Sequence, residues 1–214
     1  MELAANNINK TIRGKVILSN VSLCLKSGNV YGFAGRNGSG KTMLFRALSG
    51  LMRIDSGSIV WEDKTLHKDI AVLPSLGIII ENAGLYPNFT GIQNLTYLAN
   101  LTKRVGREEI IHAITRVGLD PYDKRLYGKY SLGMKQRLAI AQAVMEKPDV
   151  IMSDEPTNSL DETGVEEIRK IILEEKARGA LILIASHNKE DIRVLADEWY
   201  KVENGQVIRQ EESL

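Results

Sequence analysis

Hydrophobic and polar positions alternate along the first part of the chain. In KVILSNVSLCLK (residues 15–26), Val21, Leu23 and Leu25 alternate with polar or small residues, and this period of two predicts a strand with one buried face. GSIVWED (57–63) predicts a second, shorter strand after a turn. The chain up to about Asp63 is therefore expected to be rich in β-structure.

The spacing of apolar residues changes between about residues 82 and 146. Three segments there carry apolar residues three and four positions apart, which is the spacing of an amphipathic helix. They are GIQNLTYLANLT (91–102), GREEIIHAITRVGL (106–119) and YSLGMKQRLAIAQAVME (130–146). Three helices in succession predict a helical lobe within a single domain of 214 residues.

Three short apolar runs predict strands buried on both faces. They are NVYGFAG (29–35), DVIMSDEP (149–156) and ALILIASH (180–187). The helices predicted after them are KTMLFRALSGL (41–51), with Met43, Leu44, Ala47, Leu48 and Leu51 on one face, DETGVEEIRKIILEEKARG (161–179), closed by Gly179, and NKEDIRVLA (188–196). EWYKVENGQVIRQ (198–210) predicts a final hairpin that turns at Asn204-Gly205. Strands alternating with helices predict an α/β fold whose parallel sheet is covered on both faces.

The composition narrows the class of protein. Apolar residues make up 43% of the chain, charged residues 26%, and the net charge is +1, as in ordinary globular proteins. The chain has no long basic block, which argues against nucleic-acid binding. Apolar stretches such as ALILIA (180–185) fall far short of the roughly 20 residues that span a bilayer. With no signal pattern at the N-terminus and Cys24 as the single cysteine, a cytoplasmic location is expected.

A glycine-rich loop joins a predicted strand to a predicted helix. GRNGSGKT matches the pattern G-x-x-x-x-G-K-[ST], whose backbone N–H groups surround phosphate oxygens. The predicted nucleotide-binding residues are Gly35, Arg36, Asn37, Gly38, Ser39, Gly40, Lys41 and Thr42. Lys41 is expected to reach the β- and γ-phosphates of ATP, and the Thr42 hydroxyl is expected to bind Mg²⁺.

Two further strand ends carry candidate catalytic residues. Asp154 and Glu155 end the run VIMSDEP, at the carboxyl edge of the sheet where α/β folds bind ligands. Asp154 is expected to hold Mg²⁺, and Glu155 to orient or deprotonate the attacking water. His187 follows LILIAS, where it is either a sensor of the γ-phosphate or simply a polar residue leaving the core.

The segment YSLGMKQR (130–137) by itself predicts only a helix start with Ser131 as N-cap. The order of this segment and the other motifs along the chain says more about function. The chain resembles the ATP-binding cassette family, the nucleotide-binding subunits of ABC transporters, over nearly its whole length. GRNGSGKT is similar to the phosphate loop of that family and VIMSDEP to its second motif. YSLGMKQR stands in the place of the signature sequence, NSLD (158–161) is similar to the D-loop, and SHN (186–188) to the switch histidine.

The resemblance implies a P-loop NTPase fold with an N-terminal antiparallel β lobe and an inserted helical lobe. It implies an ATPase with ATP and Mg²⁺ as cofactors and with Glu155 and His187 as catalytic residues. Two such cassettes pair head to tail, so Ser131, Gly133, Met134 and Asp161 are expected to contact the nucleotide of a second ATP-binding subunit, giving a homodimer. A separate transmembrane permease is the other implied partner, which would place the chain on the cytoplasmic face of the membrane.

Three positions depart from the family pattern. Glu81 stands where a glutamine is expected at the lobe boundary. It is interpreted as a metal-side or coupling residue and not as the base, with a solvent-facing position as the alternative. Ile12 stands where an aromatic residue commonly stacks on adenine, which leaves base selectivity open. Leu132 and Met134 make the signature unusual.

IIIENAGLYPNFTGIQNL (78–95) and YSLGMKQRLAIAQAV (130–144) together resemble the branch that includes bacitracin- and lantibiotic-type peptide exporters. An exporter of antimicrobial peptides or drug-like substrates is therefore expected. The alternatives are an ABC ATPase without a transport role and a small-molecule kinase. Only about 50 residues separate Glu81 from Ser131, which leaves no room for the long coiled coil of DNA-repair members.

Overall fold

Two β-sheets form the centre of the protein in the computed structural model, which describes residues 1–80 and 84–210. The smaller sheet has the strand order β2-β1-β4-β5, and its neighbouring strands are all antiparallel. Its strands are β1 (Glu2–Ile12), β2 (Lys15–Lys26), β4 (Ser56–Trp61) and β5 (Lys64–Thr65). The expected antiparallel β lobe at the N-terminus is therefore confirmed.

The larger sheet has six strands in the order β10-β9-β3-β8-β7-β6. Its strands are β3 (Val30–Ala34), β6 (Leu76–Ile79), β7 (Val150–Asp154), β8 (Leu181–Ser186), β9 (Glu198–Glu203) and β10 (Gln206–Gln210). All neighbours are parallel except β9 and β10. That hairpin turns at Asn204 and Gly205, both with positive φ (51° and 77°), as a two-residue turn between twisted strands requires.

The helices fall where the apolar spacing predicts them. They are α1 (Lys41–Leu48), α2 (Gly91–Thr102), α3 (Arg107–Arg116), α4 (Leu132–Val144), α5 (Glu162–Ala177) and α6 (Lys189–Leu195). One detail is wrong: Leu51 lies beyond the end of α1 and is 58% exposed, whereas Phe45 is fully buried on the inner face of that helix. Gly50, with φ +87°, ends the helical path before Leu51.

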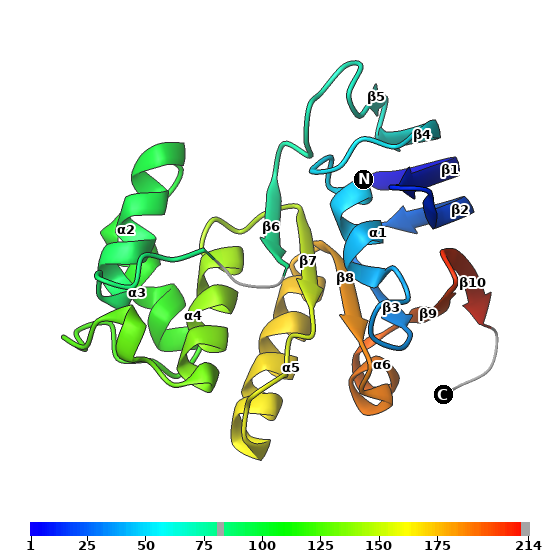
Figure 1. The fold of residues 1–214 in the computed structure, drawn as a ribbon. Coiled ribbons are helices and arrows are strands. Elements are labelled where there is room, and N and C mark those ends of the chain that lie inside the picture. Colours follow the sequence, from blue (N-terminus) through cyan, green and yellow to red (C-terminus); the bar gives the residue numbers. More distant parts are fainter. Residues whose placement is uncertain (81–83, 211–214) are drawn as a thin grey trace.

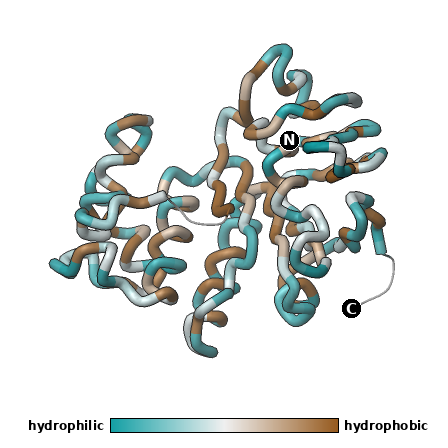
Figure 2. Tube along the Cα trace, viewed as in Figure 1, coloured by the Kyte–Doolittle hydropathy of each residue, from teal (hydrophilic) through white to brown (hydrophobic). Residues whose placement is uncertain are grey.

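The central strands β3, β7 and β8 of the larger sheet are buried on both faces, and successive side chains of each strand point to opposite sides. In β8, Ile182 and Ile184 pack into one apolar cluster with α4, α5 and α6. Leu183 and Ala185 pack into a second cluster with α1 and the smaller sheet. In Figure 2 the central strands carry much of the hydrophobic colouring. This arrangement leaves the carboxyl edge of the sheet as the place where polar side chains can gather.

The helices α2, α3 and α4 lie together on one side of the molecule (Figure 1). They follow β6 and precede β7 in the chain, within the expected helical lobe. Arg116 of α3 reaches α5, where it pairs with Glu174 (2.8 Å) and with Glu175, which is 3% exposed. Arg178 also donates to Glu175 (2.8 Å), so this buried carboxylate has two cations beside it. These ion pairs fix the helical lobe against α5.

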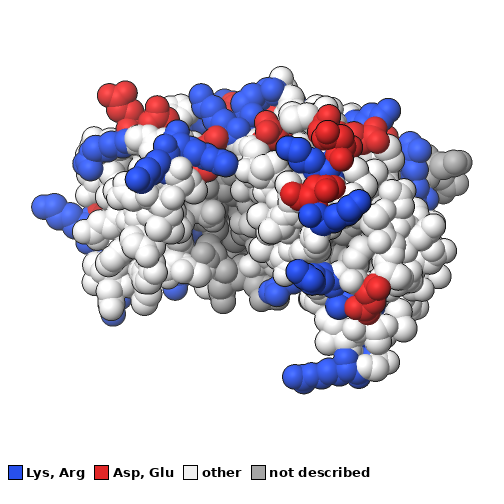
Figure 3. All heavy atoms as spheres, turned by 90° about the horizontal axis from the view of Figure 1, so that it is seen from above, with Lys and Arg blue, Asp and Glu red and all other residues white. Residues whose placement is uncertain are grey.

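The outer surface carries charges of both signs. On the face shown in Figure 3, Lys and Arg side chains lie among Asp and Glu, in keeping with the net charge of +1. No helix within residues 1–80 and 84–210 has both the length and the apolar character needed to cross a membrane.

Candidate functional site

The glycine-rich loop turns directly from β3 into α1 and wraps around its own lysine. Gly40, the residue before the helix, has φ +112°. In this left-handed conformation a residue with a side chain would be strained. Lys41 is 6% exposed, and its Nζ donates to the carbonyl oxygens of Gly35 (2.6 Å) and Arg36 (3.3 Å). Within the described part of the chain, no carboxylate pairs with this ammonium. A buried cation whose described partners are neutral carbonyl groups is suited to receive an anion.

Thr42 and Asp154 meet at the start of α1. The Thr42 hydroxyl donates to the Asp154 carboxylate, although the two residues are 112 positions apart. Asp154 ends β7, and the carboxyl ends of β7 and β8 lie at the same edge of the sheet (Figure 1). A hydroxyl and a carboxylate are hard oxygen ligands of the kind that Mg²⁺ prefers.

Glu155 and His187 face each other across the ends of β7 and β8. His187 donates its backbone N–H to Glu155 Oε1 (3.0 Å), and its Nδ1 lies 2.9 Å from Oε2. Ser186 adds a hydroxyl donor to Oε2 at 3.2 Å. The Glu155 side chain keeps 21% exposure and that of His187 57%, so both can reach a ligand. The two residues thus contact each other directly at the carboxyl edge of the sheet.

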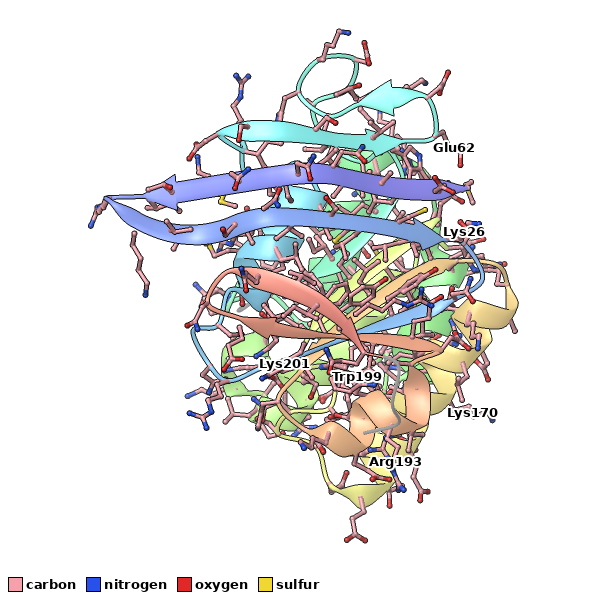
Figure 4. All side chains as sticks on the ribbon, turned by 90° about the vertical axis from the view of Figure 1, so that its right-hand side faces the viewer. Lys26, Glu62, Lys170, Arg193, Trp199 and Lys201 are labelled. Carbon is pink, nitrogen blue, oxygen red and sulfur yellow. The ribbon has the colours of Figure 1, made fainter. Side chains whose placement is uncertain are left out.

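These elements line one cleft of about 1250 Å³. All eight residues of the predicted phosphate loop line it, together with Asp154, Glu155 and His187. Its other walls include Lys15, Val16 and Ile17 from β2, Asn158 and Ser159, and Trp199, Lys201 and Glu203 from β9. Figure 4 shows Trp199 and Lys201 on this strand. The cleft is large enough for a nucleoside triphosphate.

Charge in the cleft favours a polyanion. Lys15, Arg36, Lys41, Lys189 and Lys201 supply five basic side chains, against the carboxylates of Asp154, Glu155 and Glu203. A hydrogen bond from Lys201 lowers the pKa of Glu203, so this carboxylate is ionised and its charge is balanced by the neighbouring lysine. The remaining cations are available to phosphate groups.

Two residues predicted to lie beside the chain's own nucleotide, Ile12 and Glu81, are not among the described residues that line the cleft. Ile12 ends β1 opposite Lys15 and is not among the described residues that line the cleft, so its role beside the base stays a prediction. Val16 and Ile17 do line the cleft, although no motif in the sequence marks them. Glu81 lies outside the described residues.

The remaining predicted residues form a second group, which we call the α4–α5 rim: Ser131, Gly133, Met134 and Asp161. None of the four is among the described residues lining the cleft. Ser131 caps α4 by accepting the backbone N–H of Met134 (3.2 Å), and Asp161 caps α5 by accepting that of Gly164 (3.0 Å).

The rim is held together by a close approach at Gly133. A Cβ at this position would stand 2.9 Å from the carbonyl oxygen of Ser159, so only glycine lets the start of α4 lie against the segment before α5. Leu132, between the two predicted contact residues, is 70% exposed. The side chain of Asp161 is 79% exposed. The rim therefore presents helix-start groups to the outside of the molecule.

Sequence reasoning missed Gln136, one turn into α4. Its side-chain amide donates to the carbonyl oxygens of Glu155 (3.1 Å) and Pro156 (3.0 Å). Nothing in the spacing of the chain distinguishes this glutamine from Gln142 on the same helix, because the contact depends on how α4 packs on the end of β7.

Comparison with known proteins finds relatives that align with nearly the whole chain. The ABC transporter family profile matches residues 18–158. The uncharacterised ABC transporter ATP-binding protein YybJ of Bacillus subtilis is 47% identical over 94% of this chain and 92% of its own length. The lantibiotic transport ATP-binding protein SrtF of Streptococcus pyogenes is 36% identical over 98% of this chain and 90% of its own length. The bacitracin transport ATP-binding protein BcrA of Bacillus licheniformis is 34% identical over 97% and 69%.

A solved structure has the same fold. The dimeric structure of MJ0796, a bacterial ABC transporter cassette, superposes with a TM-score of 0.88 over 99% of both chains, at 23% identity.

Proposed function

This chain belongs to the ATP-binding proteins of ABC transporters and is an ATPase of that family, and we propose that it powers a separate membrane permease. The proposed cargo of that permease is an antimicrobial peptide or a drug-like molecule, which it exports. The observation that carries the proposal is that the phosphate-loop lysine, Asp154, Glu155 and His187 line a single cleft. One ligand can therefore contact the anion site and the candidate base together.

In this proposal each side chain has one task. Lys41 and the N–H groups at the start of α1 hold the β- and γ-phosphates and stabilise their charge. Glu155 accepts a proton from the water whose oxygen bonds to the γ-phosphorus, while the bond from that phosphorus to the bridging oxygen of ADP breaks. His187 contacts Glu155 on one side and is exposed on the other, which suits it to sense the γ-phosphate.

Thr42 and Asp154 are the residues proposed to hold Mg²⁺. Their direct contact shows that a hydroxyl and a carboxylate converge at the start of α1, which fits a hard divalent cation. When bound, Mg²⁺ would supply positive charge to the phosphate oxygens. Glu81 remains a proposed metal-side residue.

The proposed partner at the α4–α5 rim is a second ATP-binding subunit. Ser131 and Gly133 stand at the N-terminus of α4, where free N–H groups and the helix dipole favour an anion such as the γ-phosphate bound by the other copy. Met134 and Asp161 would flank the same nucleotide. A two-fold dimer would use this contact twice. The dimeric state of the MJ0796 cassette, which shares this fold, supports such a pairing.

The permease and its cargo are inferred from relatives. SrtF and BcrA are named for the transport of a lantibiotic and of bacitracin, which supports a peptide-like substrate. A permease with its own membrane spans would hold the chain at the inner face of the cell membrane.

The first test of this function is hydrolysis of ATP without any acceptor molecule. The purified chain with Mg-ATP is expected to release inorganic phosphate continuously, because water is the proposed acceptor. Phosphate release would be followed by a coupled colorimetric assay, with chain heated above its unfolding temperature as the blank. Turnover that appears only after a phosphate acceptor is added would mean that the chain is a kinase.

Replacing Ser131 by arginine is expected to block dimer formation and leave ATP binding to the single chain intact. The long side chain would fill the space proposed for the partner's γ-phosphate. Dimer formation would be measured by size-exclusion chromatography with Mg-ATP in a Glu155→Gln background, where the nucleotide persists. Ser131→Ala is the control, because it loses the same helix cap, worth about 1 kcal/mol, without adding bulk. A Ser131→Arg chain that still dimerises would show that this residue does not face the partner.

A further inference from the structure

The candidate base stands in a costly backbone conformation. Glu155 has φ +54°, in the left-handed region, where a residue other than glycine costs on the order of 1–3 kcal/mol. It also precedes Pro156, and a residue before proline normally prefers extended backbone. Such a conformation persists only when surrounding contacts hold it. The contacts that hold Glu155 therefore decide where its carboxylate points.

Hydrogen bonds to β8, to Asn158 and to α4 hold the backbone at Glu155. The N–H of Glu155 donates to the carbonyl oxygen of Ala185 in β8 (2.8 Å), which ties the residue just after β7 to the sheet. Its carbonyl oxygen accepts hydrogen bonds from the backbone N–H of Asn158 (3.2 Å) and from the side-chain amide of Gln136 (3.1 Å). The carbonyl oxygen of Pro156 accepts from the same Gln136 nitrogen at 3.0 Å.

We propose that Gln136 is a positioning residue for ATP hydrolysis. Its Nε2 bridges the carbonyl oxygens of Glu155 and Pro156, so it locks the left-handed turn and thereby aims the Glu155 carboxylate into the cleft. The inference rests on the proposed role of Glu155 as the base. The side chain of Gln136 is suited to this task because one amide nitrogen carries two hydrogens, one for each carbonyl.

Gln136 also connects two parts of the molecule. It lies on α4, whose first residues form the α4–α5 rim, whereas Glu155 belongs to the sheet edge. Gln136 is thus a hydrogen-bonded link between the helix start proposed to face the partner's nucleotide and the base that acts on the chain's own nucleotide.

The test compares Gln136→Met and Gln136→Glu with the unmodified chain. Methionine keeps the length and volume of the side chain but cannot donate. An ionised glutamate keeps the shape but presents oxygens to the two carbonyl oxygens. In both variants kcat is expected to fall tenfold or more, while the KM for ATP changes less than threefold, because the phosphate-loop contacts remain. Thermal unfolding, followed by circular dichroism, provides the check on folding, and Gln142→Met on the same helix is the matched control.

A double variant separates this role from a general loosening of the site. With Glu155→Gln already present, adding Gln136→Met should change the residual hydrolysis rate less than twofold, because the group that Gln136 positions is no longer a base. A further tenfold loss would overturn the inference, since Gln136 would then act through another group.

The single variants distinguish failure of the inference from failure of the premise. Gln136→Met and Gln136→Glu chains that keep the original kcat, beside an inactive Glu155→Gln chain, would overturn the positioning role alone. A Glu155→Gln chain with near-original activity would overturn the base assignment itself.

Discussion

A Glu155→Gln chain is expected to bind Mg-ATP as tightly as the unmodified chain and to hydrolyse it at least 100-fold more slowly. Glutamine preserves the size of the side chain and can still accept the N–H of His187, but it cannot take a proton from water. General-base catalysis typically contributes a factor of 10² to 10⁴, or about 3–5 kcal/mol of the barrier. Because bound ATP is no longer consumed, we also expect this variant to accumulate as an ATP-dependent dimer.

Single-turnover phosphate release and size-exclusion chromatography with Mg-ATP would measure these two effects. Glu190→Gln is the matched control, because Glu190 is exposed on α6 and its pKa is lowered by its hydrogen bond to Arg193, outside the cleft. It should behave as the unmodified chain. Near-original hydrolysis by Glu155→Gln would refute the base role of this glutamate.

Removing the charge of Lys41 is expected to weaken ATP binding on the order of 100-fold, about 3 kcal/mol, as charged hydrogen bonds to phosphate oxygens are lost. Lys41→Ala removes the whole side chain, and Lys41→Met keeps most of its buried length. Both variants should lose ATP affinity to the same extent if the ammonium group is what binds the phosphates. Titration with a fluorescent ATP analogue would measure the dissociation constant.

The control for this prediction is Lys170→Ala, a lysine exposed on α5 (Figure 4). Thermal unfolding of the Lys41 variants would show whether the loop still folds without its bonds to Gly35 and Arg36. Unchanged affinity in a folded Lys41→Met chain would contradict the phosphate-loop assignment.

Local pattern was sufficient for much of the fold. Alternation in 15–26 predicts β2, and helical spacing in 91–102 predicts α2, because these signals come from which face of an element must be buried. The hydrophobic pattern does not predict the strand β6 (Leu76–Ile79), since a run of four residues carries too little periodicity. Leu51 was misplaced for a related reason: its spacing continues the apolar face of α1, but Gly50 has already turned the chain.

The amino-acid pattern alone predicts the candidate site: a phosphate loop at 35–42, the carboxylates Asp154 and Glu155, and an order of motifs that resembles the ABC family. Those signals are local, because each lies within a few residues at a strand end or helix start. The contacts between distant groups become visible only in the folded chain: Thr42 with Asp154, His187 with Glu155, and Gln136 with the carbonyl oxygens of Glu155 and Pro156. Such contacts depend on the packing of α4 and the parallel strands, and no spacing along the chain encodes the distance between two elements.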